Sequence, residues 1–123
     1  MNGNSYLLDT NIVLYMLDGD ETLTEMLYRK KLYVSFINEL ELLSYSSLNS
    51  KERERIVRFL EDCIVVDINE HIKEETIRLR RAYKLKLPDS IVLGTGSYLS
   101  IPVISSDKEF KKIKGSKIIY YEK

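Results

Sequence analysis

Four acidic residues stand where this sequence would otherwise build hydrophobic core. Asp9 and Asp107 each follow a short apolar run that has the character of a buried strand. Asp89 follows Pro88 at a predicted helix start, and Glu41 lies within another predicted helix. A buried carboxylate without a partner is costly, so each acid needs a compensating group. Taken singly, each of the three aspartates could simply cap a helix. Taken together, the four acids predict a shared site.

Two glutamates compete for a place in that site, because Glu39 and Glu41 share the helix predicted over 37–48. At 100° per residue, Glu41 lies at the edge of an apolar face that includes Leu40 and Leu48, whereas Glu39 points nearer the opposite side. We therefore expect Glu41 in the pocket and Glu39 in solvent.

Clustered carboxylates repel one another, which raises their pKa values unless a cation neutralises them. Ligands that are all oxygen suit Mg²⁺ or Mn²⁺, and such ions can polarise a phosphodiester. The single histidine, His71, lies in a polar stretch and is expected at the surface, while Cys63 begins an apolar run and is expected as a packed thiol. These assignments exclude zinc, a Ser-His-Asp site and two-histidine ribonuclease chemistry.

The elements that must position these acids alternate along the chain. Strands are predicted at 6–8, 32–35, 64–67, 103–105 and 117–120. Helices are predicted near 10–18, 21–30, 37–48, 51–62, 70–84 and 89–99, with a short helical turn near 108–112. This alternation favours one α/β domain over 1–123, with right-handed crossovers and a mostly parallel sheet covered on both faces. Sites in such sheets lie beyond the carboxyl ends of the strands. Gly94 and Gly96 inside a helix indicate a helix backbone packed very close to a neighbour.

Composition is that of an ordinary globular protein, with 44% hydrophobic and 31% charged residues. The longest apolar run, 12–17, is too short to cross a bilayer, and the start of the chain does not resemble a signal peptide. With one cysteine and no export signal, we expect a reducing cytoplasm and no membrane association.

Charge is balanced overall but divided along the chain. Residues 1–77 carry 8 basic and 15 acidic side chains, and residues 78–123 carry 11 and 4. The zero net charge argues against non-specific coating of nucleic acid. The basic clusters are either solvated helix faces or a rim that guides a polyanion to the acids, and Arg80, Arg81 and Lys84 are the candidate polyanion-binding residues of that rim. Those clusters contain Arg78, Arg80, Arg81, Lys84 and Lys86, and then Lys108, Lys111, Lys112, Lys114 and Lys117.

Segments 7–11, 35–42, 87–92 and 101–110 resemble, in order and spacing, those of the PIN-domain family (named for the PilT N-terminus), and specifically its VapC-type toxin ribonucleases. The resemblance covers nearly the whole chain; no one segment is very specific, but the ordered set is. It implies an α/β/α sandwich of about five strands and an endoribonuclease that uses Mg²⁺ or Mn²⁺. It also implies an RNA substrate, a homodimer and a small antitoxin partner.

Residue by residue, the resemblance assigns the catalytic and metal-binding quartet to the four acids and supporting roles to Asn11 and Ser105. The family pattern favours threonine at Asn38 and at Ser105, and alanine at Leu93, Gly94 and Gly96. These departures concern substrate fit and interfaces more than catalysis. The quartet is Asp9, Glu41, Asp89 and Asp107.

Two other functions fit parts of the same pattern. A receiver-like phosphoacceptor domain would use Asp67 as its nucleophile, with Asp9 holding a metal, Ser105 or Ser106 after a later strand, and Lys123 near the end. It lacks the usual adjacent acids after the first strand and a well-placed lysine. A catalytically silent PIN-like binding module is the other alternative, and the intact quartet argues against it.

Overall fold

A five-stranded sheet forms the centre of the structure, a computed structural model that describes residues 4–123. Its strands lie in the order β3-β2-β1-β4-β5, and every neighbouring pair is parallel. The predicted α/β fold class is therefore confirmed, and the sheet is parallel throughout. The strands are β1 (Ser5–Leu8), β2 (Lys31–Ser35), β3 (Ile64–Val66), β4 (Val103–Ser105) and β5 (Ile118–Tyr120).

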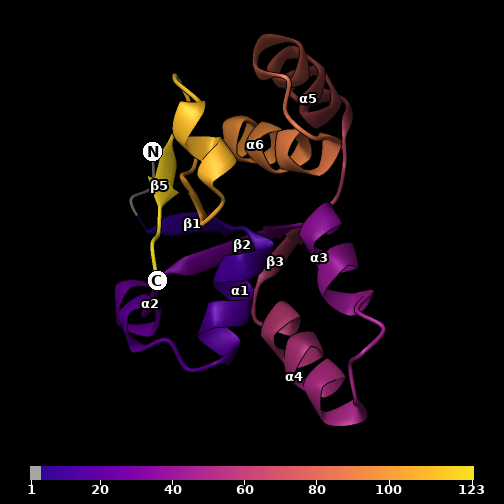
Figure 1. The fold of residues 1–123 in the computed structure, drawn as a ribbon, viewed down its shortest axis with the longest axis vertical. Helices are drawn as coiled ribbons and strands as arrows, with labels where there is room; N and C mark the ends of the chain where they lie inside the picture. The colour runs from indigo at the N-terminus through magenta and orange to yellow at the C-terminus, as the bar shows by residue number, and fades with distance from the viewer. Residues whose placement is uncertain (1–3) are drawn as a thin grey trace.

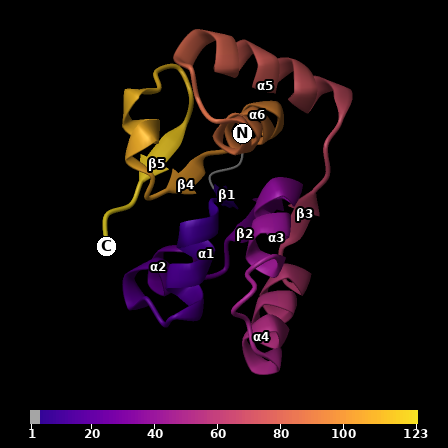
Figure 2. The same cartoon turned by 45° about the vertical axis from the view of Figure 1, so that its right-hand side comes forward.

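Helices cover the sheet on both faces and make it a three-layer sandwich (Figure 1). The segments α1 to α4 form one layer; α6 forms the other, and α5 packs on α6 (Figure 2). No helix within residues 4–123 has both the length and the apolar character that a membrane crossing needs. The helices are α1 (Thr10–Leu17), α2 (Glu21–Met26), α3 (Phe36–Leu43), α4 (Ser50–Glu61), α5 (Glu70–Tyr83), α6 (Leu87–Leu99) and the 3₁₀ helix η1 (Lys108–Lys112).

The central strand explains how one short segment serves two cores. Successive side chains of a strand point to opposite faces, so Leu7 and Leu8, both fully buried, enter different clusters. Leu8 packs with residues of α1 to α4, including Ile12 and Leu42. Leu7 packs with residues of α5 and α6, including Leu79. Because β1 is buried from both sides, the residue that follows it has a rigid support.

The strand order creates a switch point between β1 and β4. From β1 the chain continues to β2 and then to β3 at one edge of the sheet. The connection through α5 and α6 then returns the chain to the other side of β1, where it forms β4. Connections that diverge from two neighbouring strands leave a crevice at their carboxyl ends. Asp9 follows β1 and Asp107 lies two residues after β4, so both acids are at this crevice.

All five predicted strands are found, and their ends differ from the prediction by no more than one residue. Two helices end four or five residues before their predicted ends. The helix predicted over 37–48 ends at Leu43, where Ser44 is the cap and its hydroxyl donates to the Leu40 carbonyl. A new helix then begins behind Asn49, which forms a capping box with Glu52. The helix predicted over 21–30 ends at Met26, before a turn in which Arg29 has a φ of 60°.

The predicted close approach at the two helical glycines is confirmed. A Cβ built on Gly94 would lie 2.8 Å from Thr76 Oγ1 and 3.2 Å from the Thr76 nitrogen, so α5 and α6 meet there nearly backbone to backbone. A Cβ on Gly96 would lie 2.5 Å from Val103 Cγ2, which places α6 equally close to β4. These two glycines seat α6, and with it Asp89, against its neighbours.

Replacement of Gly94 by alanine is expected to destabilise the fold. The added methyl group would overpack the contact at a cost of about 1–3 kcal/mol. That exceeds the roughly 0.5–1 kcal/mol that alanine gains in a helix. Urea unfolding of Gly94→Ala measures the loss. In a Thr76→Ala background, which removes the Oγ1 atom, the same substitution should cost less; a Gly94→Ala protein more stable than wild type would show that the helices do not meet as described.

Candidate active site

One pocket of about 180 Å³ gathers all four predicted acids at the switch point. Its walls come from the residues that follow β1 and β4, from the start of α1, from α3 and the loop after it, and from the first two turns of α6. Each acid thus reaches the pocket from a different element, although 98 residues separate the first from the last. The lining residues are Asp9, Thr10, Asn11, Asn38, Glu41, Tyr45, Pro88, Asp89, Val92 and Asp107.

Asp9 is the most firmly held of the four acids. Its Oδ1 accepts hydrogen bonds from the Thr10 nitrogen (2.9 Å) and from Asn38 Nδ2 (3.2 Å). Its Oδ2 accepts from Ser105 Oγ (2.7 Å), and that hydroxyl oxygen in turn accepts from the Asp107 nitrogen (3.0 Å). Burial nevertheless raises the pKa of Asp9, and the nearby charges of Glu41 and Asp107 add to the rise. Asp9 also caps α1, so capping and the site use the same side chain.

Glu41 enters the pocket through a small network with Thr10 and Asn38. Thr10 Oγ1 donates to Glu41 Oε1 at 2.7 Å, and Asn38 Nδ2 lies 3.1 Å from the same oxygen. Asn38 Nδ2 also donates to Thr10 Oγ1 at 2.8 Å. Glu41 is otherwise exposed, at the rim of the pocket, whereas Asn38 is buried beneath it.

Asp89 carries the clearest sign of crowded negative charge. Burial, followed by the charges of Asp107 and Asp9, raises its pKa to about 6. Lys86, just before α6, acts in the opposite direction but does not cancel the rise. Asp107 itself caps η1 and accepts from the Glu109 nitrogen at 2.9 Å. The acids are therefore close enough to influence one another's protonation, which is the condition that a cation would relieve.

The donor chemistry of the pocket fits a hard divalent ion. Every charged ligand available is a carboxylate, with amide and hydroxyl oxygens beside them, and Mg²⁺ and Mn²⁺ prefer such oxygens. Within residues 4–123, no three acidic, histidine or cysteine side chains converge tightly enough to hold an ion as they stand. Binding would thus require at least some of the carboxylates to move closer together.

Residues outside the pocket agree with most of the sequence analysis. Glu39 is absent from the lining, as expected, but it is half-buried and not fully solvated. The reasoning that selected Glu41 was partly wrong, because Leu40 is 52% exposed and Leu48 lies beyond the end of α3. His71 is exposed and stacks on Tyr98, as a surface residue should.

Cys63 is half-buried against the core cluster of the α1–α4 face, in agreement with its assignment as a packed thiol. Burial, with the nearby Asp62, raises its pKa to about 11. A thiol with that pKa stays protonated at neutral pH and is a poor nucleophile.

Three polar residues of the pocket were not predicted as site residues: Thr10, Asn38 and Tyr45. Two of them carry a signal that the sequence contains, since Asn38 lies three residues before Glu41 and Tyr45 four residues after it. Both spacings place side chains near that of Glu41 on a helix. Tyr45 in fact lies just past α3, where it is 42% exposed and lines the pocket.

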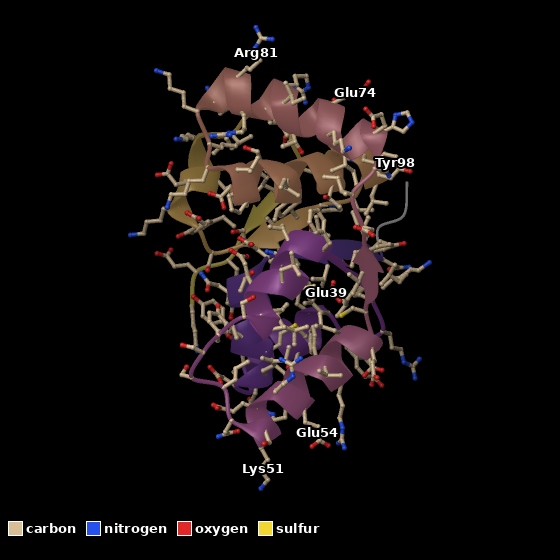
Figure 3. All side chains as sticks on the ribbon, turned by 90° about the vertical axis from the view of Figure 1, so that its right-hand side faces the viewer. Glu39, Lys51, Glu54, Glu74, Arg81 and Tyr98 are labelled. Carbon is tan, nitrogen blue, oxygen red and sulfur yellow. The ribbon has the colours of Figure 1, made fainter. Side chains whose placement is uncertain are left out.

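Of the three candidate residues of the predicted basic rim, one makes a structural side-chain hydrogen bond and the other two are exposed. Arg80 Nε donates to the Leu85 carbonyl and so ties the end of α5 to the turn before α6. Arg81 extends outward from α5 (Figure 3). Lys84 is exposed on the same turn, which continues to Lys86 and the mouth of the pocket.

Comparison with known families decides the identity of the fold. A family model of the PIN domain matches residues 6–116. The chain belongs to the PIN-domain family. Comparison with curated proteins gives no significant match. The family assignment also removes the receiver-like alternative, whose nucleophile Asp67 follows the edge strand β3 and does not line the pocket.

Solved structures similar to this PIN domain include chains from toxin–antitoxin complexes. A chain of a toxin-antitoxin complex from Klebsiella pneumoniae is 28% identical, with a TM-score of 0.81 over 95% of this chain and 98% of that one. VapBC-1 from nontypeable Haemophilus influenzae is 25% identical, with a TM-score of 0.77 over 94% and 97%. VapBC2 from Rickettsia felis, bound to a DNA fragment from its promoter, shares the fold at 18% identity and a TM-score of 0.84 over 96% and 99%.

From the raised pKa of Asp89 we predict how the stability of the metal-free PIN domain depends on pH. An unfolded aspartate has a pKa near 3.8, against about 6 here, so the folded state binds more protons between those values. The contribution of Asp89 to the free energy of unfolding should therefore fall as pH rises from about 4 to 6, and stay low above that range. Asp89→Asn should gain stability over wild type by pH 7.5 and lose that advantage near pH 4.

Urea unfolding in metal-free buffer at several pH values measures this difference. Asp9, whose pKa is also raised, should leave some pH dependence in the same direction in the variant. A difference between the two proteins that stays constant from pH 4 to 7.5 would contradict the assignment.

Proposed function

We propose that this PIN domain is a metal-dependent endoribonuclease and the toxin of a toxin–antitoxin pair. The observation that carries the proposal is the convergence of Asp9, Glu41, Asp89 and Asp107 on one pocket at the sheet's switch point. Membership of the PIN family and the similarity to chains of toxin–antitoxin complexes support it.

The four carboxylates would hold Mg²⁺ or Mn²⁺. When bound, the ion supplies a Lewis acid for a phosphodiester and for the oxygen that leaves it. Asp9, fixed by donors from three segments, would serve as the constant anchor, with Ser105 fixing its second oxygen. Glu41 at the rim and Asp89 at the start of α6 would supply further oxygen ligands, and Asn11 lines the pocket that the RNA would enter.

The substrate would approach along the basic side of the molecule. A pocket of four acids repels a phosphate backbone, so RNA needs positive charge close by. The exposed turn of Lys84 and Lys86 leads directly to the pocket, and Arg81 extends this surface along α5. Tyr45 offers an aromatic face at the rim on which an unpaired base could stack.

The small antitoxin and the homodimer belong to the same proposal. Support for the antitoxin comes from the similar chains seen in toxin–antitoxin complexes, and the homodimer follows from the family resemblance. A gene for a small DNA-binding protein next to this one would support the pairing, and light scattering of the purified chain would measure its oligomeric state.

Neutral replacement of the acids should abolish most RNA cleavage. In Asp9→Asn, Asp89→Asn and Asp107→Asn, and in Glu41→Gln, a group that holds the ion loses its charge. Groups that stabilise transition-state charge are each worth about 100- to 1,000-fold in rate. Cleavage of a labelled RNA with Mg²⁺ or Mn²⁺ present measures the loss, and excess chelator should stop the wild-type reaction.

Two matched controls accompany these variants. Glu39→Gln changes a glutamate of the same helix that does not line the pocket, and Asp67→Asn changes an acid after a strand that lies at the sheet edge. Both should retain cleavage. Wild-type activity that persists in excess chelator would sink the metal-dependent mechanism, and a folded wild type without cleavage of any RNA would favour the silent binding module.

Charge reversal on the basic side should weaken RNA binding. Arg81→Glu with Lys84→Glu leaves Arg80 in its structural role. If each residue contacts one phosphate, the slope of log affinity against log salt should become shallower by roughly 0.7 per contact for a single strand. Filter binding of catalytically inactive Asp9→Asn protein over a salt series measures it.

Lys51→Glu is the matched control, because Lys51 lies on α4 at the far end of the molecule from Arg81 (Figure 3). It should change neither affinity nor slope. An Arg81→Glu, Lys84→Glu protein with unchanged affinity and salt slope would assign these residues to another surface.

A further inference from the structure

Asn38 is a buried amide that contacts three oxygens of the acidic pocket. It is 1% exposed and lies in α3, one turn before Glu41. Its Nδ2 atom lies 3.2 Å from Asp9 Oδ1, 2.8 Å from Thr10 Oγ1 and 3.1 Å from Glu41 Oε1. It therefore bridges carboxylates that come from two different segments of the chain.

The other end of the amide shows what determines its orientation. Among the described residues, Asn38 Oδ1 is a buried side-chain atom with no hydrogen-bond partner. Burying an amide oxygen without a donor is unfavourable. Turning the amide over would place this oxygen against the carboxylates of Asp9 and Glu41 and would remove their donor. The orientation of the Asn38 amide therefore satisfies the carboxylates of Asp9 and Glu41 and leaves its own oxygen without a donor.

The hydrogen bonds form a directed chain. Nδ2 has two hydrogens for three acceptors, and the Thr10 hydroxyl gives its single hydrogen to Glu41. A neutral donor between two negative groups draws them together without adding charge. It also leaves lone pairs on both carboxylates free for another ligand.

We propose that Asn38 is a positioning residue that, with Thr10, holds Asp9 and Glu41 in the arrangement that a divalent cation requires. This inference rests on the proposed function, in which the pocket binds Mg²⁺ or Mn²⁺. Asn38 itself touches neither ion nor substrate. Donors behind a metal-binding carboxylate fix its orientation, and their loss weakens metal binding about 10- to 100-fold.

The test measures binding of Mn²⁺ alone to the full chain by calorimetry. Asn38→Leu keeps much of the side-chain volume and removes both donors, so its Kd for Mn²⁺ should rise about 10- to 100-fold. Asn38→Thr retains one hydroxyl donor and should show a smaller rise. Thr95→Val is the matched control, because Thr95 is also buried and helical but donates to Ile91 within α6. It should bind Mn²⁺ as wild type does, even if it is less stable.

A second measurement uses the wild-type protein and needs no variant to fold. In nitrogen-15-labelled protein, the side-chain amide resonances of Asn38 should shift as Mg²⁺ is added. Those of Asn49, which caps α4 away from the pocket, should not. An Asn38 amide that does not respond while Mg²⁺ shifts the backbone signals of Asp9 and Glu41 would overturn the inference.

The outcomes separate this inference from the proposed function. If wild type binds Mn²⁺, Asp9→Asn does not, and folded Asn38→Leu retains wild-type affinity, then Asn38 has no positioning role and the metal site stands. If wild type and Asp9→Asn bind equally weakly, the metal site fails and the role of Asn38 fails with it.

Discussion

The repulsion among carboxylates at one end of a parallel sheet is the constraint on which the rest of this structure depends. Asp9 follows the central strand, where burial and two other acids oppose its charge. Hydrogen-bond donors from three segments stabilise the Asp9 carboxylate. These segments are the start of α1, the side of α3 and the end of β4. Each donor reaches Asp9 only when its own helix or strand is correctly placed. The pKa of this one side chain therefore depends on the sheet order and on the positions of the helices.

The two-sided core provides the stiffness that this arrangement needs. Because Leu7 and Leu8 are buried on opposite faces, β1 cannot move relative to either helical layer without losing apolar contact. The layer formed by α6 is also held by close contacts. Gly94 allows α6 to lie against α5, and Gly96 allows α6 to lie against β4. Asp9, at the end of the central strand, and Asp89, in α6, therefore belong to different layers of the sandwich. The pocket lies where these two layers meet.

The sequence was sufficient for the strands and the acids because both leave a local pattern. A short apolar run that ends in a polar residue marks a strand end, and this pattern predicts Asp9 and Asp107 at the carboxyl ends of the strands. Helix ends were predicted less well, since competition by Ser44 for a backbone carbonyl and a restart at Asn49 depend on local detail. For Asn38, the helical spacing to Glu41 is visible in the sequence, but the contact with Asp9, 29 positions away, is not.

The four acids are not equivalent, and the difference follows from what surrounds each one. Asp9 has both oxygens bound by donors, which fixes its position and favours its charged form against burial. For Asp89, burial and then the charges of the other three acids raise the pKa to about 6, although Lys86 opposes the rise. A cation placed nearby would lower this pKa, and a phosphate placed nearby would raise it. The pocket thus combines one fixed anchor with one adjustable acid, and the basic turn at 84–86 lies beside the adjustable one, where an approaching polyanion would first alter the balance.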